Sequence, residues 1–252
     1  NGASTGGPND TVGGGIVNWY GALTLTRTTV SDNRASLAAG ISNSFEGTVL
    51  VLNDSTVSGN TAHGYYAGGI SNEEKAVLTC INSTISGNHV GGAPVQNQYS
   101  NVAGGLHNFR ATATLTGCTV SDNVAQGRAG GIMNWTTHPS LPAAMTLTDS
   151  TISGNRSETD GPAAFWNETA AATFTNCTIS GNEALSIAGG IYTTTGMMDI
   201  RSTTITANRL LTTPHGAGGI WVAGPTVLRN TIIAGNFDES PQTPSASDCF
   251  SG

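Results

Sequence analysis

The sequence predicts an all-β protein, a single parallel β-solenoid of about eight coils with no substantial helix. Two short motifs each occur eight times along the 252 residues, which is typical of a repeat architecture. Glycine occupies 34 positions and charged residues make up only 10% of the chain, a composition that favours strands and turns. No window of ten or more residues shows the 3.6-residue apolar period of a helix.

The first motif pairs a β-branched apolar residue with an asparagine three positions later. It reads TVSDN at 29–33, TVSGN at 56–60, TISGN at 84–88, TVSDN at 119–123, TISGN at 151–155, TISGN at 178–182, TITAN at 204–208 and IIAGN at 232–236. Asparagine tolerates left-handed backbone geometry, and stacked amides can hydrogen-bond from coil to coil. We therefore expect a structural ladder of Asn33, Asn60, Asn88, Asn123, Asn155, Asn182, Asn208 and Asn236.

Further columns of the repeat predict the core. Five positions before the apolar residue of the motif, each coil has Leu, Ile, Phe or Cys, and seven positions before it the residues are apolar in most coils. Two positions before it, every residue is Thr, Ser or Cys. Alternation along a strand places these columns inside the solenoid, with equivalent strands about 4.8 Å apart.

The second motif precedes each copy of the first. It reads GGIVN at 14–18, AGISN at 39–43, GGISN at 68–72, GGLHN at 104–108, GGIMN at 130–134, AAFWN at 163–167, GGIYT at 189–193 and GGIWV at 218–222. We expect the small pair to allow a backbone bend that a Cβ would obstruct, with two or three short strands in each unit. The unit length varies from 26 residues (Asn182 to Asn208) to 35 residues (Asn88 to Asn123), so loops are inserted at the coil edges.

The repeats define one domain with two flanking segments. We predict an N-terminal extension at 1–11, the β-helix at 12–236 and a C-terminal tail at 237–252. Neither end contains a predicted capping helix, although solenoid ends expose unpaired strands. Three interpretations remain open: the tails cap the ends, the natural chain continues, or the ends pair with other copies and form a head-to-tail polymer.

Composition and charge exclude several classes of function. The net charge is −7, with one lysine and scattered arginines, which predicts no nucleic-acid partner. No apolar run reaches the length of a transmembrane helix, so we expect no membrane insertion. The four cysteines show no CxxC spacing, and the histidines show no metal-ligand spacing, so no cofactor or metal is predicted. We interpret Cys118 and Cys177, two coils apart, as buried thiols.

The paired GG[IL] and [IV]SGN motifs resemble the right-handed parallel β-helix repeats of bacterial surface and secreted proteins. They are similar to the repeats of polymorphic outer-membrane protein adhesins and of related arrays that end in a C-terminal anchor domain. The ending SASDCFSG at 245–252 resembles the Asp-Cys segment that follows the last coils of such arrays. The resemblance covers about residues 12–236. It implies a right-handed solenoid at the cell surface or outside the cell, and it specifies the activity only weakly.

Catalysis is not expected, because no pair of carboxylates occupies equivalent positions in adjacent coils. Asp32 and Asp122 share a column but lie three coils apart, as do Asp54 and Asp149. We therefore assign no catalytic residue and predict that the chain is not an enzyme. A polysaccharide lyase or hydrolase with its site in the loops 89–103 and 135–144 remains the least favoured alternative.

One column stands out as a candidate interaction surface. The residue after the apolar position of the second motif is expected to face solvent, and in the later coils it is large: Met133, Trp166, Tyr192 and Trp221. Such a stripe suits protein contacts or stacking against sugar rings. The sequence therefore favours a structural solenoid, a subunit of an extracellular filament or a rod segment of a bacterial surface protein. It would associate with itself or with neighbouring domains through its coil ends and this stripe. The alternative is a carbohydrate-binding adhesin module with a glycan partner.

Overall fold

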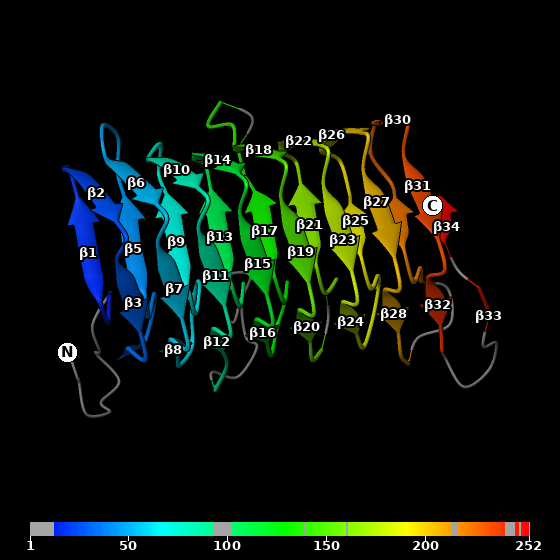
Figure 1. Ribbon diagram of the computed structural model, residues 1–252, viewed down its shortest axis with the longest axis horizontal. Coiled ribbons are helices and arrows are strands. Elements are labelled where there is room, and N and C mark those ends of the chain that lie inside the picture. Colours follow the sequence, from blue (N-terminus) through cyan, green and yellow to red (C-terminus); the bar gives the residue numbers. More distant parts are fainter. Residues whose placement is uncertain are drawn as a thin grey trace.

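The structure is a computed structural model and describes residues 13–92, 102–138, 140–159, 161–212, 216–239, 245–246 and 248–251. The predicted extension 1–11 and most of the insertion 89–103 lie outside the described residues. The chain winds through four sheets, which are parallel except at one terminal strand, so each coil has four strands rather than the two or three expected (Figure 1). The solenoid makes about seven turns, from β1 at one end to β34 at the other.

Sheets 1 and 2 are the two longer-stranded sides of the solenoid, and sheet 1 carries the second motif. Sheet 1 contains β1 (Ile16–Trp19), β5 (Ile41–Ser44), β9 (Ile70–Glu73), β13 (Leu106–Phe109), β17 (Ile132–Trp135), β21 (Phe165–Glu168), β25 (Ile191–Thr193), β29 (Ile220–Val222) and β34 (Cys249–Ser251). Sheet 2 contains β2 (Ala22–Thr26), β6 (Val49–Asn53), β10 (Val77–Ile81), β14 (Thr112–Thr116), β18 (Ala144–Thr148), β22 (Ala171–Thr175), β26 (Met197–Arg201) and β30 (Thr226–Arg229).

Sheets 3 and 4 have shorter strands, and sheet 3 carries the first motif. Sheet 3 contains β3 (Thr29–Ser31), β7 (Thr56–Ser58), β11 (Thr84–Ser86), β15 (Thr119–Ser121), β19 (Thr151–Ser153), β23 (Thr178–Ser180), β27 (Thr204–Thr206) and β31 (Ile232–Ala234). Sheet 4 contains β4 (Arg34–Ala35), β8 (Thr61–Ala62), β12 (His89–Val90), β16 (Val124–Ala125), β20 (Arg156–Ser157), β24 (Glu183–Ala184), β28 (Arg209–Leu210), β32 (Phe237–Asp238) and β33 (Ser245–Ala246).

The registers confirm the predicted columns. Val57, Ile85 and Val120 are paired across β7, β11 and β15, and Leu52, Cys80 and Leu115 across β6, β10 and β14. These side chains form one core along the axis, and most of them are fully buried. Among the described residues no helix has the length and apolar character needed to cross a membrane.

The predicted asparagine ladder is present and has a direction. Each Nδ2 donates to the Oδ1 of the asparagine in the next coil, from Asn33 through to Asn236, at 2.7–2.9 Å. The same Oδ1 accepts the backbone N–H of the preceding asparagine, for example Asn88 N to Asn123 Oδ1 at 3.0 Å. The sequence suggested left-handed backbone geometry at the asparagine itself. In the structure it is the preceding residue that has a positive φ, for example Asp32 (58°), Gly59 (64°) and Asp122 (56°). The asparagine is thereby turned inward, where the amides stack.

A second ladder, not predicted, follows the asparagine of the second motif. Its Nδ2-to-Oδ1 bonds of 2.7–2.9 Å link Asn18, Asn43, Asn72, Asn108, Asn134 and Asn167. The ladder ends there because the next two coils have Thr193 and Val222 in this column. Apart from the half-buried Asn33, the asparagines of both ladders are buried, so their amides have partners one coil away in place of water.

The Gly pair is required by close approach between coils. A Cβ on Gly131 would lie 2.5 Å from the carbonyl oxygen of Ala164 in the next coil and 3.1 Å from Cγ of Asn155. The same crowding recurs at Gly40 and Gly69. The small residues therefore let the backbone of one coil pass directly beneath the next, beside the first ladder.

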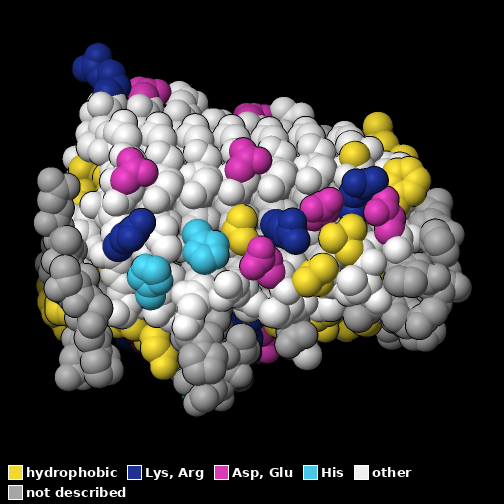
Figure 2. Space-filling model, turned by 90° about the horizontal axis from the view of Figure 1, so that it is seen from below, with side chains coloured by type: hydrophobic (Ala, Val, Ile, Leu, Met, Phe, Trp, Pro, Cys, Tyr) yellow, Lys and Arg dark blue, Asp and Glu magenta, His cyan; other side chains and the backbone are white. Residues whose placement is uncertain are grey.

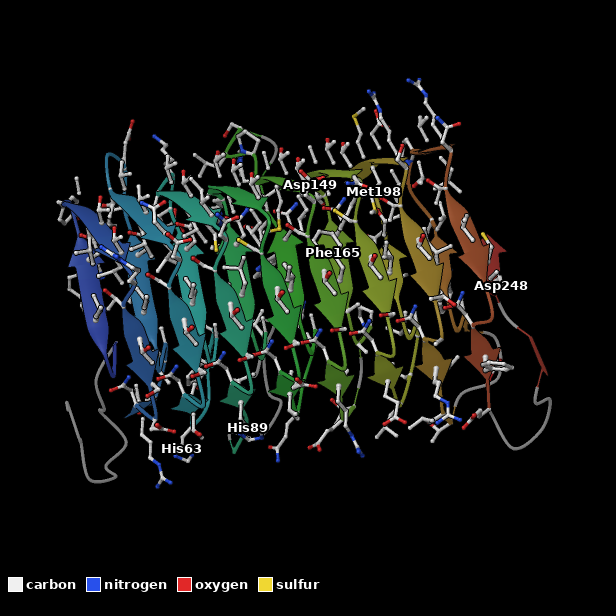
Figure 3. The ribbon with its side chains drawn as sticks, viewed as in Figure 1. His63, His89, Asp149, Phe165, Met198 and Asp248 are labelled. Atoms are coloured by element: carbon white, nitrogen blue, oxygen red, sulfur yellow. The ribbon has the colours of Figure 1, made fainter. Side chains whose placement is uncertain are left out.

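The segment 237–252, expected as a tail, contributes strands to the solenoid. β34 extends sheet 1 by pairing with β29, and β32 extends sheet 4 and pairs antiparallel with β33. The carboxylate of Asp248 accepts both N–H and Nδ2–H of Asn236 at 3.0 Å, at the end of the solenoid labelled in Figure 3. Asp248 takes the place that the second glycine of the motif has in other coils. The N–H of Ile220 donates to the Asp248 carbonyl, and in the preceding coil the N–H of Ile191 donates to the Gly219 carbonyl in the same way. An acceptor-only side chain therefore closes the donor end of the first ladder.

Candidate functional surface on sheet 1

The outer face of sheet 1 changes from coil to coil. Outside the inward apolar and asparagine positions, successive strands carry serine, histidine, methionine and aromatic side chains. The predicted stripe lies here, but its four members are not equally exposed. Trp166, Tyr192 and Trp221 are partly exposed, whereas Met133 is completely buried.

The prediction that Met133 faces solvent is wrong, because other side chains cover this part of the sheet. Met133 packs with Val102, Ala103, Ala129 and Trp135 in a second apolar cluster outside the solenoid core. Its side chain points away from the axis as alternation requires, but Val102, Trp135 and the alanines that precede the Gly pair bury it. The candidate stripe is thereby reduced to three aromatic residues.

The three remaining aromatic residues follow one another along the axis, with adjacent rings inclined at 58° and 60°. The ring centroids of Trp166 and Tyr192 are 5.5 Å apart, and those of Tyr192 and Trp221 are 5.4 Å apart. The Arg128 guanidinium lies 5.2 Å from the Trp166 ring centroid and 3.6 Å from Oε2 of Glu168. Burial raises the pKa of the Glu168 carboxyl, and the charge of Arg128 opposes this shift. The stripe is therefore a partly exposed aromatic row that ends at an ion pair.

A buried polar network lies beside the methionine cluster. The imidazole of His107 stacks between Tyr66 (5.7 Å) and Phe109 (5.9 Å). Its Nε2 accepts a hydrogen bond from Nε1 of Trp135 at 2.6 Å, and its Nδ1 lies 3.1 Å from Oγ of Ser71. The same Nδ1 lies 3.3 Å from Oε1 of Glu73.

The Ser71, His107 and Glu73 side chains are the three types of a hydrolase triad, but their geometry is different. Trp135 can only donate, so Nε2 of His107 carries no proton and Nδ1 must be the donor. The Ser71 hydroxyl donates to the Glu73 carboxylate and not to the imidazole. A triad histidine must instead take the proton of the serine. Ser71 and His107 are also buried, so this network holds the sheet face together and offers no nucleophile.

A pocket opens next to this network, over the first three coils. It has a volume of about 280 Å³ and is lined by Trp19, Leu37, Ser42, Ser44, Phe45, Tyr66, Glu73 and Glu74. Trp19 is 44% exposed, and its ring meets that of Phe45 edge-on at 5.7 Å. Aromatic walls, hydroxyls and two carboxylates are grouped here, in a space close to the lower end of the usual range for ligand pockets, about 300 Å³. The sequence did not predict this pocket, because its residues come from loops as well as strands.

The side of the molecule formed by sheet 4 carries scattered ionisable side chains. Figure 2 shows the face of sheet 4, where acidic, basic and imidazole side chains are interspersed. His63 and His89, labelled in Figure 3, come from successive coils, but His89 is paired with Thr61 rather than His63. No group of three or more His, Cys, Asp or Glu side chains suited to a metal occurs among the described residues.

Comparisons with models of known protein families, with curated proteins and with solved structures found no match. The resemblance to bacterial surface repeats therefore rests on the motifs alone. The fold that these motifs predicted is present.

Proposed function

We propose that the protein is a non-enzymatic structural β-solenoid, a rigid rod segment of a bacterial surface or secreted protein. The observation that supports this most is the first asparagine ladder, which links all eight copies of the motif and ends on Asp248. The invariant polar residues of the repeat are thereby used to hold coils together. Seven spacings between β2 and β30 give a rod of about 34 Å.

The two ends of the rod suggest how it joins its neighbours. Sheets 2 and 3 end at β30 and β31 within the described residues, and Val227, Leu228 and Ile232 are exposed there. Sheets 1 and 4 continue further, and β34 occupies the place that the first strand of another copy would take. A head-to-tail filament requires β34 to be displaced, whereas a rod segment requires no such change. This difference favours the rod segment over the filament subunit.

Electron microscopy and light scattering of two chains test this proposal. The full chain is compared with a chain ending at residue 244, which lacks Asp248 and β34. We expect single short rods for the full chain and end-to-end association for the shortened chain. Ordered filaments of the full chain would identify a filament subunit instead, and release of sugar from polysaccharide by the purified chain would contradict a non-enzymatic role.

The second candidate is a glycan-binding adhesin, supported by the pocket at Trp19. Carboxylates and hydroxyls accept hydrogen bonds from sugar hydroxyls, and an exposed indole offers a stacking face. A glycan array with the wild type, Trp19→Ala and Trp166→Ala separates the two aromatic surfaces. Binding lost only in Trp19→Ala assigns the pocket, binding lost only in Trp166→Ala assigns the stripe, and an array without signal removes this candidate.

A further inference from the structure

Two thiols meet inside the solenoid core. Cys80 lies within β10, and Cys118 follows β14 in the next coil. Both side chains are buried, and their Sγ atoms are 3.0 Å apart. This separation is about 1 Å longer than the bond of a disulfide, roughly 2.05 Å. The two sulfurs therefore need only a small movement to become bonded.

Each of these cysteines replaces a different kind of residue. The column of Cys80 is otherwise Leu, Ile or Phe, and the column of Cys118 is Ser or Thr except at Cys177. In the second column the hydroxyls bridge coils, as when Ser83 Oγ accepts the N–H of Ser55 at 2.9 Å. The cysteines at 80 and 118 are far apart in sequence but adjacent in space, so their side chains are placed to form a crosslink between two coils.

Cys177 provides an internal comparison. It occupies the same column as Cys118, but the residue that corresponds to Cys80 in the preceding coil is Leu147. Its Sγ lies 3.5 Å from the carbonyl oxygen of Leu147. Burial raises the pKa of the Cys177 thiol. The hydrogen bond between the two thiols instead lowers the pKa of Cys118 in the folded chain.

We propose that Cys80 and Cys118 form an intercoil disulfide when the chain folds in the presence of a low-molecular-weight disulfide such as oxidised glutathione. The Cys118 thiolate attacks one glutathione sulfur and releases the other glutathione as a thiolate. The Cys80 thiolate then attacks Sγ of Cys118 in this mixed disulfide and releases the second glutathione thiolate. Two cysteine thiols are oxidised, one glutathione disulfide is reduced, and the two cysteine protons pass to the glutathione thiolates. Since both sulfurs are buried in the folded chain, the exchange takes place during folding.

This inference does not depend on the proposed structural role. The experiment refolds the full chain from denaturant at low concentration, with and without oxidised glutathione, and uses circular dichroism to confirm folding. Thiol titration is expected to fall from four free thiols to two, and peptide mass mapping is expected to join the peptides of Cys80 and Cys118. The melting temperature of the oxidised chain should exceed that of the reduced chain by several degrees.

Matched variants keep the test decisive. Cys80→Val keeps an apolar side chain of similar size, Cys118→Ser uses the residue type of its column, and each variant is expected to fold without forming the crosslink. Leu147→Cys places a thiol opposite Cys177 and is expected to add a second crosslink. Four titratable thiols in the folded, oxidised wild type would overturn the proposal. A crosslink that uses Cys177 or Cys249 in place of Cys80 and Cys118 would also overturn it.

Discussion

Asparagine at the end of the first motif satisfies several buried groups at once. The Oδ1 of Asn123 accepts two hydrogen bonds from Asn88, and its Nδ2 donates to Asn155 and to the carbonyl of Ile85. This role was predictable, because an invariant amide within a stacked repeat has few other partners. The second ladder was less predictable, because its asparagine is replaced by Thr193 and Val222 in the last two coils.

Replacing a central asparagine should therefore be costly. We expect Asn123→Ala to lower the free energy of unfolding by about 4 kcal/mol, because four buried partners lose a hydrogen bond. Asp122→Gly is the matched control: Asp122 is exposed at φ 56°, where most other coils have glycine. Its effect should stay below about 1 kcal/mol. Urea unfolding measures both, and equal effects would refute the structural role of the amide.

The burial of Glu168 should make the stability of the folded chain depend on pH. The pKa of its carboxyl is higher in the folded chain than in the unfolded chain. The protonated carboxyl therefore favours folding in acid, and this stability is lost as the pH rises through the folded-state pKa. We expect Glu168→Gln to be more stable than the wild type at pH 7, and the difference to vanish as the pH falls below the ordinary carboxyl range. Urea unfolding at the two pH values checks this. A wild type that is the more stable at pH 7 would show that the Arg128 ion pair outweighs burial.

At the scale of the elements, the repeat spacing predicted which residues face the core, but not what covers the outside. Met133 points away from the axis as alternation requires, yet Val102, Ala103 and Ala129 bury it. Periodicity fixes the direction of a side chain relative to its own strand. It does not predict how large the neighbouring side chains are: Ala103 and Ala129 belong to the alanine column before the Gly pair, whereas the columns of Val102 and Trp135 change from coil to coil.

The close stacking of coils makes a prediction about glycine. Gly131→Ala should lower the melting temperature by roughly 10 °C or prevent folding, because its Cβ would meet the Ala164 carbonyl at 2.5 Å. Gly47 lies at φ 84° with no atom within 4 Å of an added Cβ. Gly47→Ala should therefore cost only about 1 kcal/mol, from backbone strain. A larger effect at Gly47 than at Gly131 would show that backbone conformation, rather than coil approach, dominates the cost of replacing a glycine.

At the scale of the whole molecule, the ladder gives the solenoid a direction with a donor end and an acceptor end. Asp248 occupies the donor end, a role that the sequence did not reveal because the segment 237–252 has none of the repeat motifs. The rod shape was predictable from the repeat, whereas this capping contact depends on the path of the chain after the last motif.

We expect Asp248→Ala to release the last strand while leaving the central coils intact. Amide hydrogen exchange should increase in β34 and at Asn236, whose two donors lose their acceptor. Cys249→Ser, on the same strand and exposed, is the control that should not change exchange. Unchanged protection of β34 in Asp248→Ala would show that pairing with β29 alone holds the strand.

The central claim is that stacked side-chain amides bind the coils into one rod. Hydrogen exchange of the asparagine Nδ2 protons, followed by NMR spectroscopy on the ¹⁵N-labelled chain, tests it directly. Asn88, Asn123 and Asn155 should exchange orders of magnitude more slowly than Asn230, an exposed turn residue at φ 49°. Ladder amides that exchange as fast as Asn230 would contradict the account.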